Sequence, residues 1–256
     1  MTERTANRPI SRFYHGGKVR GIQDELLREF RLMIRVDGQD FLQVVVTPSL
    51  LEEFVLGFLL TRRLIKGPGD VHSLKIGKRT VSVVRTDRLR GIFPALGLLE
   101  STGTRNIALP SGKRPPVRMP ASDLQVQSET VIKGVGMLSR MPLYQRTGAT
   151  HCSILFSSSG EAIASAEDIG RHNSVDKVIG GGLMKGVDFG HCWLAVSGRL
   201  PRDMILKAVL AGIPLMASVS AATLDGVMAG ERSGVTVIGF AREKRFNCYC
   251  HPERIA

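Results

Sequence analysis

Residues 191–220 read HCWLAVSGRLPRDMILKAVLAGIPLMASVS, and this stretch decides the fold class. An apolar run over residues 191–197 is followed by Pro201 and a helical pattern, and a second apolar run follows over residues 214–220. Proline favours the first position of a helix, and short apolar runs are typical of buried strands. Two buried strands joined by one helix predict a parallel pair with a right-handed crossover.

The flanking segments continue this pattern. Residues 223–234 predict a further helix, and residues 235–241 predict a third buried strand. Upstream, residues 150–156 and 161–166 are separated by a short Ser-Gly turn, which predicts a hairpin. The segment EDIGRHNSVDKVI, residues 167–179, opens a helix that should run to about Lys185. The alternation of strands and helices predicts an α/β fold with a parallel sheet over residues 122–256.

The N-terminal part predicts a smaller α+β lobe over residues 21–121, preceded by a flexible tail over residues 1–20. Residues 31–46 alternate apolar and polar positions around Asp37-Gly38, which is a strong hairpin signal. Thr47-Pro48 predicts the cap and first residue of a helix, and the spacing from Ser49 to Glu52 fits a capping box.

Two further segments complete this organisation. Residues 71–84 predict a second strand pair. Residues 86–121 are rich in Gly, Pro, Arg and Ser and predict a long basic loop, which is usually functional or disordered. A helix is predicted from about residue 122 to residue 140, where the larger domain begins.

Charge and composition limit the classes of function. The 256 residues carry a formal net charge of +12, and the basic excess is concentrated over residues 62–118. Such a field attracts nucleic acid, nucleotides, phosphorylated cofactors or acidic proteins. Aromatic residues make up 5% of the chain and are not interleaved with a basic stretch, so a nucleic-acid platform is disfavoured. The N-terminus lacks an apolar signal core and the four cysteines lack framework spacing, which predicts a cytoplasmic protein without a membrane span.

The parallel sheet predicts where a ligand would bind. Ligands of such sheets bind at the carboxyl ends of the strands. The segments 197–199, 219–220 and 242–245 should meet at that edge. The start of the helix at residues 170–173 is a further candidate, because an anion at a helix N-terminus would use Arg171 and His172. The plainer alternative is a well-capped helix, with Asn173 as the N-cap and Asp176 completing a capping box.

The other two candidate loops also have plain alternatives. Gly198 would let a ligand approach the backbone and Arg199 would offer a fork of donors, but a tight turn with a surface arginine fits as well. Residues 242–245 crowd cations where a phosphate would lie, although a solvated charge run is the commoner explanation. Asn247 could bond to a heterocycle.

A metal site is not expected near the C-terminus. The run CYCH, residues 248–251, invites a zinc interpretation, but a deaminase site requires H-x-E followed by P-C-x-x-C. The chain has no C-x-x-C, and on an extended segment Cys248 and Cys250 would share a face while His251 points away.

Several motifs, taken in order, resemble the FdhD family of formate dehydrogenase accessory sulfurtransferases. They are TPSLLEEFVLGFLLT (47–61), TGATH (147–151), EDIGRHNSVDKVIG (167–180), VSGR (196–199), KAVLAGIPLMASVSA (207–221) and RFNCYCHPERI (245–255). The resemblance runs from about residue 30 to the C-terminus. It implies a cytidine-deaminase-like three-layer C-terminal domain with a smaller N-terminal lobe, commonly in a homodimer.

The resemblance also implies ligands and partners. Members of the family bind bis-molybdopterin guanine dinucleotide, for which GDP is a simple mimic, and no zinc is expected. They take sulfur from a cysteine desulfurase and make the cofactor competent in formate dehydrogenase. The family's cofactor-binding run falls at about residues 240–245. The residues predicted to contact the ligand are His151, Arg171, His172, Asn173, Ser197, Gly198, Arg199, Phe240, Ala241, Arg242, Glu243, Lys244, Arg245 and Asn247.

One departure bears on chemistry. The family's sulfur-carrying loop has the form S-C-G-x-C-G, whereas the corresponding residues 101–106 read STGTRN. The two cysteine positions therefore fall on Thr102 and Arg105, and a persulfide needs an accessible thiolate. The usual relay is predicted to be lost, with Cys248 or Cys250 near Arg245 as conceivable substitutes.

Three alternatives to the sulfurtransferase remain. One is a non-catalytic nucleotide-binding carrier, another is a basic RNA-binding module, and the third is a zinc deaminase. Preference for GDP over AMP would favour the carrier, whereas salt-sensitive binding to long polyanions would favour the RNA-binding module.

Overall fold

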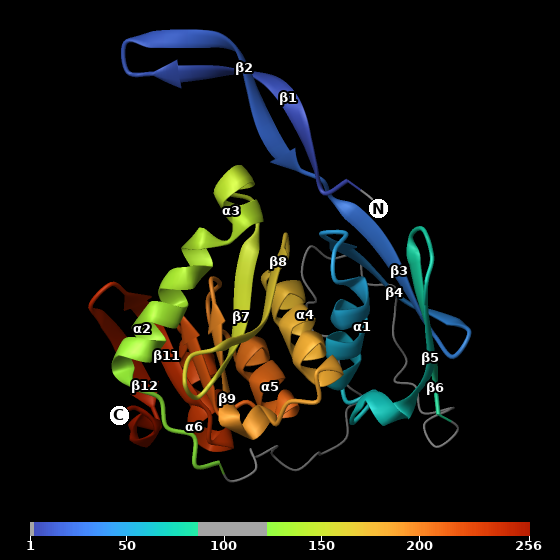
Figure 1. The fold of residues 1–256 in the computed structure, drawn as a ribbon, viewed down its shortest axis with the longest axis vertical. Helices are drawn as coiled ribbons and strands as arrows, with labels where there is room; N and C mark the ends of the chain where they lie inside the picture. Colours follow the sequence, from blue (N-terminus) through green and yellow to red (C-terminus); the bar gives the residue numbers. More distant parts are fainter. Residues whose placement is uncertain (1–2, 87–121) are drawn as a thin grey trace.

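The computed structural model describes residues 3–86 and 122–256 of the chain. Its centre is a six-stranded sheet in the order β12-β11-β10-β9-β7-β8 (Figure 1). The strands of this sheet are β7 His151–Ser157, β8 Ala162–Asp168, β9 Cys192–Val196, β10 Leu215–Ser218, β11 Thr236–Arg242 and β12 Arg245–Cys250. The three strands β9, β10 and β11 are parallel, as the sequence predicts, and β7–β8 is the predicted hairpin.

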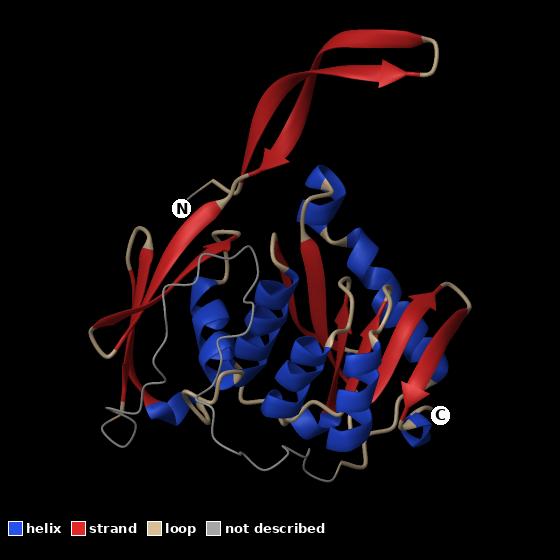
Figure 2. Ribbon diagram, turned by 180° about the vertical axis from the view of Figure 1, so that it is seen from behind, coloured by secondary structure: helices blue, strands red, loops and turns tan. Residues whose placement is uncertain are grey.

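Helices cover both faces of this sheet. The helices of the larger domain are α2 Ser128–Met137, α3 Pro142–Thr147, α4 Arg171–Met184, α5 Arg202–Ala211 and α6 Leu224–Ser233. Helix α2 packs on one face, and α4, α5 and α6 pack on the other (Figures 1 and 2). Short 3-10 turns occur at η1 Pro68–Asp70, η3 Leu138–Arg140, η4 Phe189–His191 and η5 Pro252–Arg254. No helix in the described ranges is both long and apolar enough to cross a bilayer.

The helix predicted over residues 122–140 is shorter than expected. Residues 122–127 are not helical, and Val126 instead bridges to Ile255 near the C-terminus. The backbone amide of Val126 donates to Arg254 O at 2.9 Å, so the segment gains a partner distant in sequence. This contact joins segments that are far apart in the sequence, so no pattern within residues 122–127 predicts it.

The N-terminal lobe contains a four-stranded sheet in the order β4-β3-β6-β5 and one helix. Its elements are β3 Phe30–Val36, β4 Gln39–Val46, α1 Leu51–Leu60, β5 Val71–Ile76 and β6 Thr80–Arg85. Both predicted strand pairs are confirmed. The predicted cap of α1 is wrong, because the helix begins after Leu50 and the hydroxyl of Thr47 accepts a bond from Ile169 N at 3.1 Å.

The flexible tail expected over residues 1–20 is also a wrong prediction. Strands β1 (Thr5–Tyr14) and β2 (Gly17–Leu27) form an antiparallel hairpin that projects from the body (Figure 1). Gly16, with φ of 91°, makes the tight turn. The strands carry mostly polar side chains, so the apolar alternation that marks a half-buried strand is weak.

The lobe and the larger domain meet where α1 crosses α4. A Cβ atom on Gly57 would lie 1.8 Å from Asp176 O, and one on Gly180 would lie 1.8 Å from Glu53 O. Only glycine allows the two helix backbones to approach this closely. One continuous cluster of buried side chains runs from the lobe's sheet through α1 to α4 and α5.

We predict that Gly57→Ala lowers the free energy of unfolding by about 3 kcal/mol, because the new methyl group must displace the backbone of α4. Gly136→Ala is the matched control, since a Cβ atom at Gly136 of α2 meets no atom within 4 Å. The control should be neutral or stabilising by about 0.5–1 kcal/mol. Urea denaturation measures both, and equal stability of the two variants would contradict the close helix crossing.

Candidate functional site

The topology brings ends of all six strands, including the start of β12 beside the end of β11, to one edge of the central sheet, here called the ligand edge. Strand β7 runs antiparallel to β9, and β8 runs antiparallel to β7, so the start of β7 and the end of β8 join the carboxyl ends of β9–β11. The residues at this edge are His151 at the start of β7, Asp168 at the end of β8, Ser197 after β9, Ser218 at the end of β10 and Arg242 at the end of β11. The predicted loops therefore lie at a common edge.

His151 and Ser197 form the centre of this edge. The Oγ atom of Ser197 lies 3.1 Å from His151 Nδ1 and accepts a bond from Cys152 N at 2.9 Å. Burial lowers the pKa of His151, and the nearby guanidinium of Arg171 lowers it further. The imidazole is therefore neutral at pH 7 and can act as a hydrogen-bonding group toward a ligand.

A cavity of about 350 Å³ opens beside this pair. Its lining residues come from the 3-10 turn η3 after α2, from α3, from the loop before β7 and from the strand ends. They are Leu138, Ser139, Tyr144, Gly148, Ala149, Thr150, His151, Cys152, Ile169, Ser197 and Val219. Two of the predicted ligand residues, His151 and Ser197, are among them. Arg171, Arg199 and Arg245, which the sequence also predicts as ligand contacts, do not line this cavity.

Arg171 instead lies across Gly198. A Cβ atom on Gly198 would come within 3.0 Å of both Cβ and Cδ of Arg171. Gly198 therefore makes room for the stem of this arginine. The Nε atom of Arg171 is buried and finds no hydrogen-bond partner among the described residues, whereas Arg199 is exposed. An unpartnered buried donor beside a cavity is where an anionic ligand would gain a bond.

The start of α4 is organised by Asp168 and not by Asn173. Gly170 is the N-cap, and Asp168 is completely buried at the end of β8. Its carboxylate accepts bonds from Thr47 N at 3.0 Å, Gly170 N at 2.8 Å and Asn173 Nδ2 at 2.9 Å. Lys177 Nζ lies 2.6 Å from the same carboxylate. Asp168 thus connects the N-terminal lobe, the ligand edge and the start of α4.

Asn173 is accordingly unavailable to a ligand. It is fully buried as the third residue of the helix, and its amide nitrogen also donates to Val45 O of the lobe at 2.9 Å. Both its predicted roles, as N-cap and as ligand contact, are wrong because the site is filled by the N-terminal lobe. The pattern of a capped helix could not reveal that packing.

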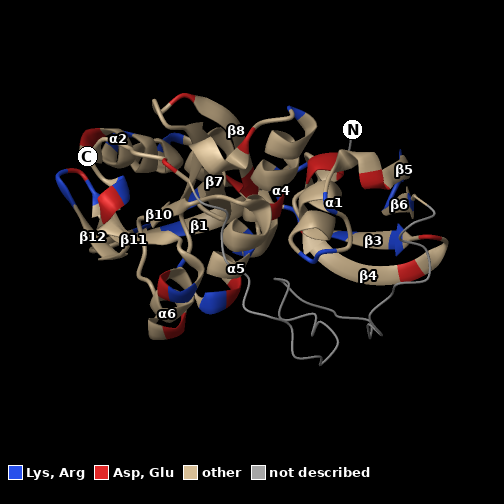
Figure 3. Ribbon diagram, turned by 90° about the horizontal axis from the view of Figure 1, so that it is seen from below, with Lys and Arg blue, Asp and Glu red and all other residues tan. Residues whose placement is uncertain are grey.

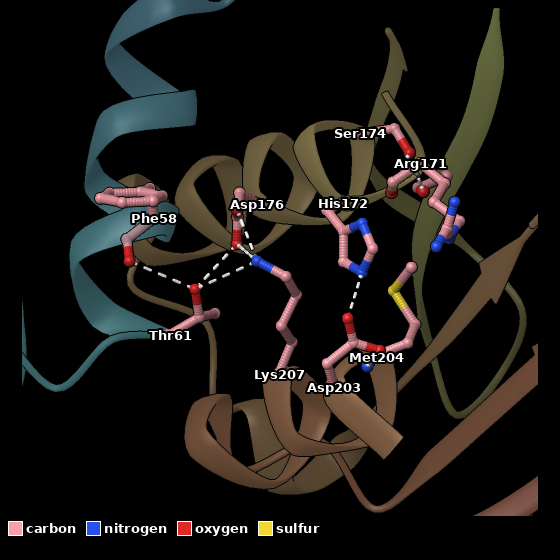
Figure 4. A network of polar contacts seen from close by, with 10 residues as sticks. Phe58, Thr61, Arg171, His172, Ser174, Asp176, Asp203, Met204 and Lys207 are labelled. Atoms are coloured by element: carbon pink, nitrogen blue, oxygen red, sulfur yellow. Dashed lines mark hydrogen bonds and ion pairs between the residues drawn. The ribbon is translucent and has the colours of Figure 1, made fainter. Parts of the chain in front are cut away.

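Asp176 also has a tertiary role in place of the predicted capping box. Its carboxylate lies 2.5 Å from Lys207 Nζ on α5 and accepts a bond from Thr61 Oγ1 at 2.8 Å (Figure 4). Burial lowers the pKa of Lys207 to about 8, and burial also lowers the pKa of Lys177. Two buried ion pairs, Asp168–Lys177 and Asp176–Lys207, therefore fix α4 against its neighbours.

His172 is buried near the ligand edge and bonds to the first turn of α5. Its Nε2 atom lies 2.8 Å from Asp203 Oδ2 in the first turn of α5, and the residue is 2% exposed (Figure 4). Burial lowers the pKa of His172, and the hydrogen bond from His172 lowers the pKa of Asp203 to about 2. Both shifts fit a neutral imidazole whose Nε2–H donates to a carboxylate. The buried His172 therefore connects the start of α4 to α5, and its predicted contact with a ligand stays a prediction.

The predicted run near the C-terminus forms a second, separate group. Ala241 is buried, whereas Arg242, Glu243, Lys244, Arg245 and Asn247 are exposed around the turn between β11 and β12 (Figure 3). Phe240 is 40% exposed with φ of 53° and donates its backbone N–H to Ser220 O at 3.0 Å. Because β10 lies between β9 and β11, and β12 lies beyond β11, two to three strand spacings of about 5 Å each separate this group from the strand that Ser197 follows.

The four cysteines are poor nucleophiles in this fold. Burial raises the pKa of Cys152 to about 12 and that of Cys192 and Cys250 to about 11, and it raises the pKa of Cys248 as well. Cys248 and Cys250, considered above as substitutes because Arg245 is near in sequence and a cation lowers a thiol pKa, instead have raised pKa values, so that expectation is wrong. A register shift pairs Ile238 with Cys248 and Val237 with Cys250, and these pairs join two different core clusters. The two thiols thus lie on opposite faces of the sheet, contrary to the extended-strand expectation.

Metal binding finds no support in the described ranges, where no three His, Cys, Asp or Glu side chains gather to hold an ion. The positions Thr102 and Arg105, where the resemblance expects cysteines, lie outside the described residues.

This geometry defines an α/β protein whose polar ligand edge lies beside the start of a helix. A family model described as the FdhD/NarQ family matches residues 27–256. The chain belongs to the FdhD/NarQ family.

Curated relatives agree with this assignment. A protein of Methanothermobacter thermautotrophicus named sulfur carrier protein FdhD is 34% identical over 97% of this chain and 98% of its own length. A protein of the same name from Anaeromyxobacter dehalogenans is 35% identical over 94% of this chain and 91% of its own length. The solved structure of a formate dehydrogenase accessory protein from Desulfotalea psychrophila shares the fold, with a TM-score of 0.82 at 24% identity over 99% of this chain and 100% of that chain.

Proposed function

We propose that this chain is an accessory protein of formate dehydrogenase that binds a guanine-dinucleotide molybdenum cofactor at the ligand edge. The names of its relatives support the accessory role. The observation that carries the binding site is the contact between His151 and Ser197 at the wall of one cavity, with Arg171 packed across the neighbouring Gly198 and its Nε atom unpartnered among the described residues.

The residues present fit one end of such a cofactor. Ligand cavities of about 300–1,000 Å³ are usual, so a cavity of about 350 Å³ accommodates a single nucleotide or pterin group. The neutral imidazole of His151 and the Ser197 hydroxyl suit the hydrogen bonds of a heterocycle. Exposed cations at Arg199, Arg242 and Arg245 suit phosphates that extend across the edge. The cofactor would supply redox chemistry to the client enzyme, while this chain binds and orients it.

We further propose that the chain carries the cofactor without relaying sulfur through loop cysteines. The relatives are named sulfur carriers, but this sequence has no cysteine before Cys152, and residues 101–106 read STGTRN. The remaining thiols are protonated at neutral pH because burial raises their pKa values. The thiolate is the reactive form, so none of the four is prepared to carry a persulfide.

The proposal has consequences for partners and location. The apoenzyme of formate dehydrogenase is the client, and the cytoplasm is the compartment in which a molybdoenzyme would be matured. A homodimer and contact with a cysteine desulfurase stay predictions from the family resemblance.

We expect GDP to bind more tightly than AMP in isothermal titration calorimetry. Arg171→Ala and Arg245→Ala should each weaken GDP binding about tenfold, because each removes a charge-assisted bond to phosphate. Arg232→Ala is the matched control, since Arg232 is exposed on α6, whose last turn leads away from the ligand edge. Unchanged GDP affinity in both edge variants would show that GDP does not bind at the ligand edge. Equal affinity for GDP and AMP would favour a polyanion-binding function.

We also expect no added sulfur mass after incubation with a cysteine desulfurase and cysteine, because accessible thiolates are lacking. Intact-mass spectrometry makes the measurement. The double variant Thr102→Cys and Arg105→Cys restores the family's cysteine positions and should gain sulfur, which is the positive control. A stable persulfide on the unaltered chain would show that another cysteine has taken over the relay.

A further inference from the structure

The hairpin β1–β2 stands away from the body on the side of the ligand edge (Figures 1 and 2). Each strand has about ten residues and spans about 30 Å. A two-stranded hairpin is only marginally stable by itself in water. Among the described residues, no further strand pairs with either outer edge of the hairpin, so both edges carry backbone groups without a strand partner there. These features are typical of an element that is stabilised by binding to another molecule.

The tip of the hairpin exposes apolar side chains on both faces. Phe13, Tyr14 and Val19 are 69%, 58% and 45% exposed. The register pairs Arg12 with Val19 and Phe13 with Lys18, so Tyr14 and Val19 share one face and Phe13 lies on the other. A tip that is apolar on both faces is suited to insertion into a cleft, where both faces are buried.

The hairpin is also basic. Arg12 pairs with Asp24 at 3.8 Å, and Lys18 lies over the ring of Phe13. Arg8 and Arg20 form no ion pair within the described part of the chain. The unpaired cations attract an acidic surface and would speed encounter with it.

The base of the hairpin is tied to the cavity wall. Glu25 of β2 pairs with Arg146 of α3. This pair, with the Glu25–Thr5 bond, lowers the pKa of Glu25 to about 2. Tyr144 of the same short helix lines the cavity beside His151. A macromolecule that holds the tip is therefore positioned to face the ligand edge.

We propose that β1–β2 is a docking arm for a protein client and inserts its tip into an acidic cleft near the client's cofactor entrance. This inference rests on the proposed function. Val19 at the tip and Leu26 at the base are exposed aliphatic side chains, so apolar surface of this kind is present at both ends of the arm. Such groups gain from burial against a protein but do not stack on bases, which favours a protein partner over nucleic acid.

Biolayer interferometry with the molybdenum-free apoenzyme of the source organism's formate dehydrogenase tests the arm. One variant combines Phe13→Ser with Tyr14→Ser, and a second combines Lys18→Glu with Arg20→Glu. The matched control combines Leu224→Ser with Arg232→Glu on α6, where Leu224 is 75% exposed. Both tip variants should bind the apoenzyme at least about tenfold more weakly, with the charge variant also losing salt dependence, and the control should change less than about twofold.

Calorimetry with GDP shows whether each variant keeps its ligand edge. Tip variants that retain GDP binding and also bind the apoenzyme like the unaltered chain would show that the hairpin is not the docking arm. The proposed function would then still stand. Failure of the unaltered chain to bind the apoenzyme would overturn both. Loss of affinity for a tRNA probe without loss of affinity for the apoenzyme would assign the hairpin to nucleic acid and overturn the proposal as well.

Discussion

The buried carboxylate of Asp168 is the interaction on which the rest of this structure depends. It lies at the end of β8, accepts backbone bonds from the lobe and from the start of α4, and pairs with Lys177 in a site that solvent does not reach. A buried charge is tolerated only when it is paired and hydrogen-bonded, so each of these partners is held in one geometry. The carboxylate thereby joins the lobe to the larger domain and sets where α4 begins.

The position of α4 then determines the ligand edge. Arg171 leaves the first turn of the helix and packs across Gly198, while His172 reaches Asp203 on α5. The glycine crossing with α1 brings the lobe against the other side of the same helix. The ligand edge therefore combines the start of a helix that is packed on several sides with the ends of the neighbouring strands. This arrangement suits a protein that must hold a ligand in one orientation until it is passed on.

The sequence predicted those parts of the fold that local patterns encode. The apolar runs around Pro201 indicated the parallel strands, and Asp37-Gly38 indicated a hairpin, because burial and turn geometry act over a few residues. Local pattern assigns Asn173, Asp176 and Thr47 to helix caps, which is their commonest local role. In the structure each of them bonds to a residue more than 30 positions away in the sequence. The register shift in β12 likewise separates Cys248 from Cys250 and has no signature in the residues themselves. Charge and topology indicated that the cationic loops share one edge of the sheet, yet they could not show that Arg171 and the cations after β11 form two groups.

Stability of an Asp168→Asn variant tests the central role of this carboxylate most directly. Removing the charge leaves the ammonium of Lys177 buried without its partner. Urea denaturation should therefore show a loss of about 3–5 kcal/mol, with part of it recovered when Lys177→Met is added. Asp225→Asn on the exposed first turn of α6 provides the comparison and should change stability by less than about 1 kcal/mol. A loss at Asp168 no larger than that at Asp225 would contradict the account.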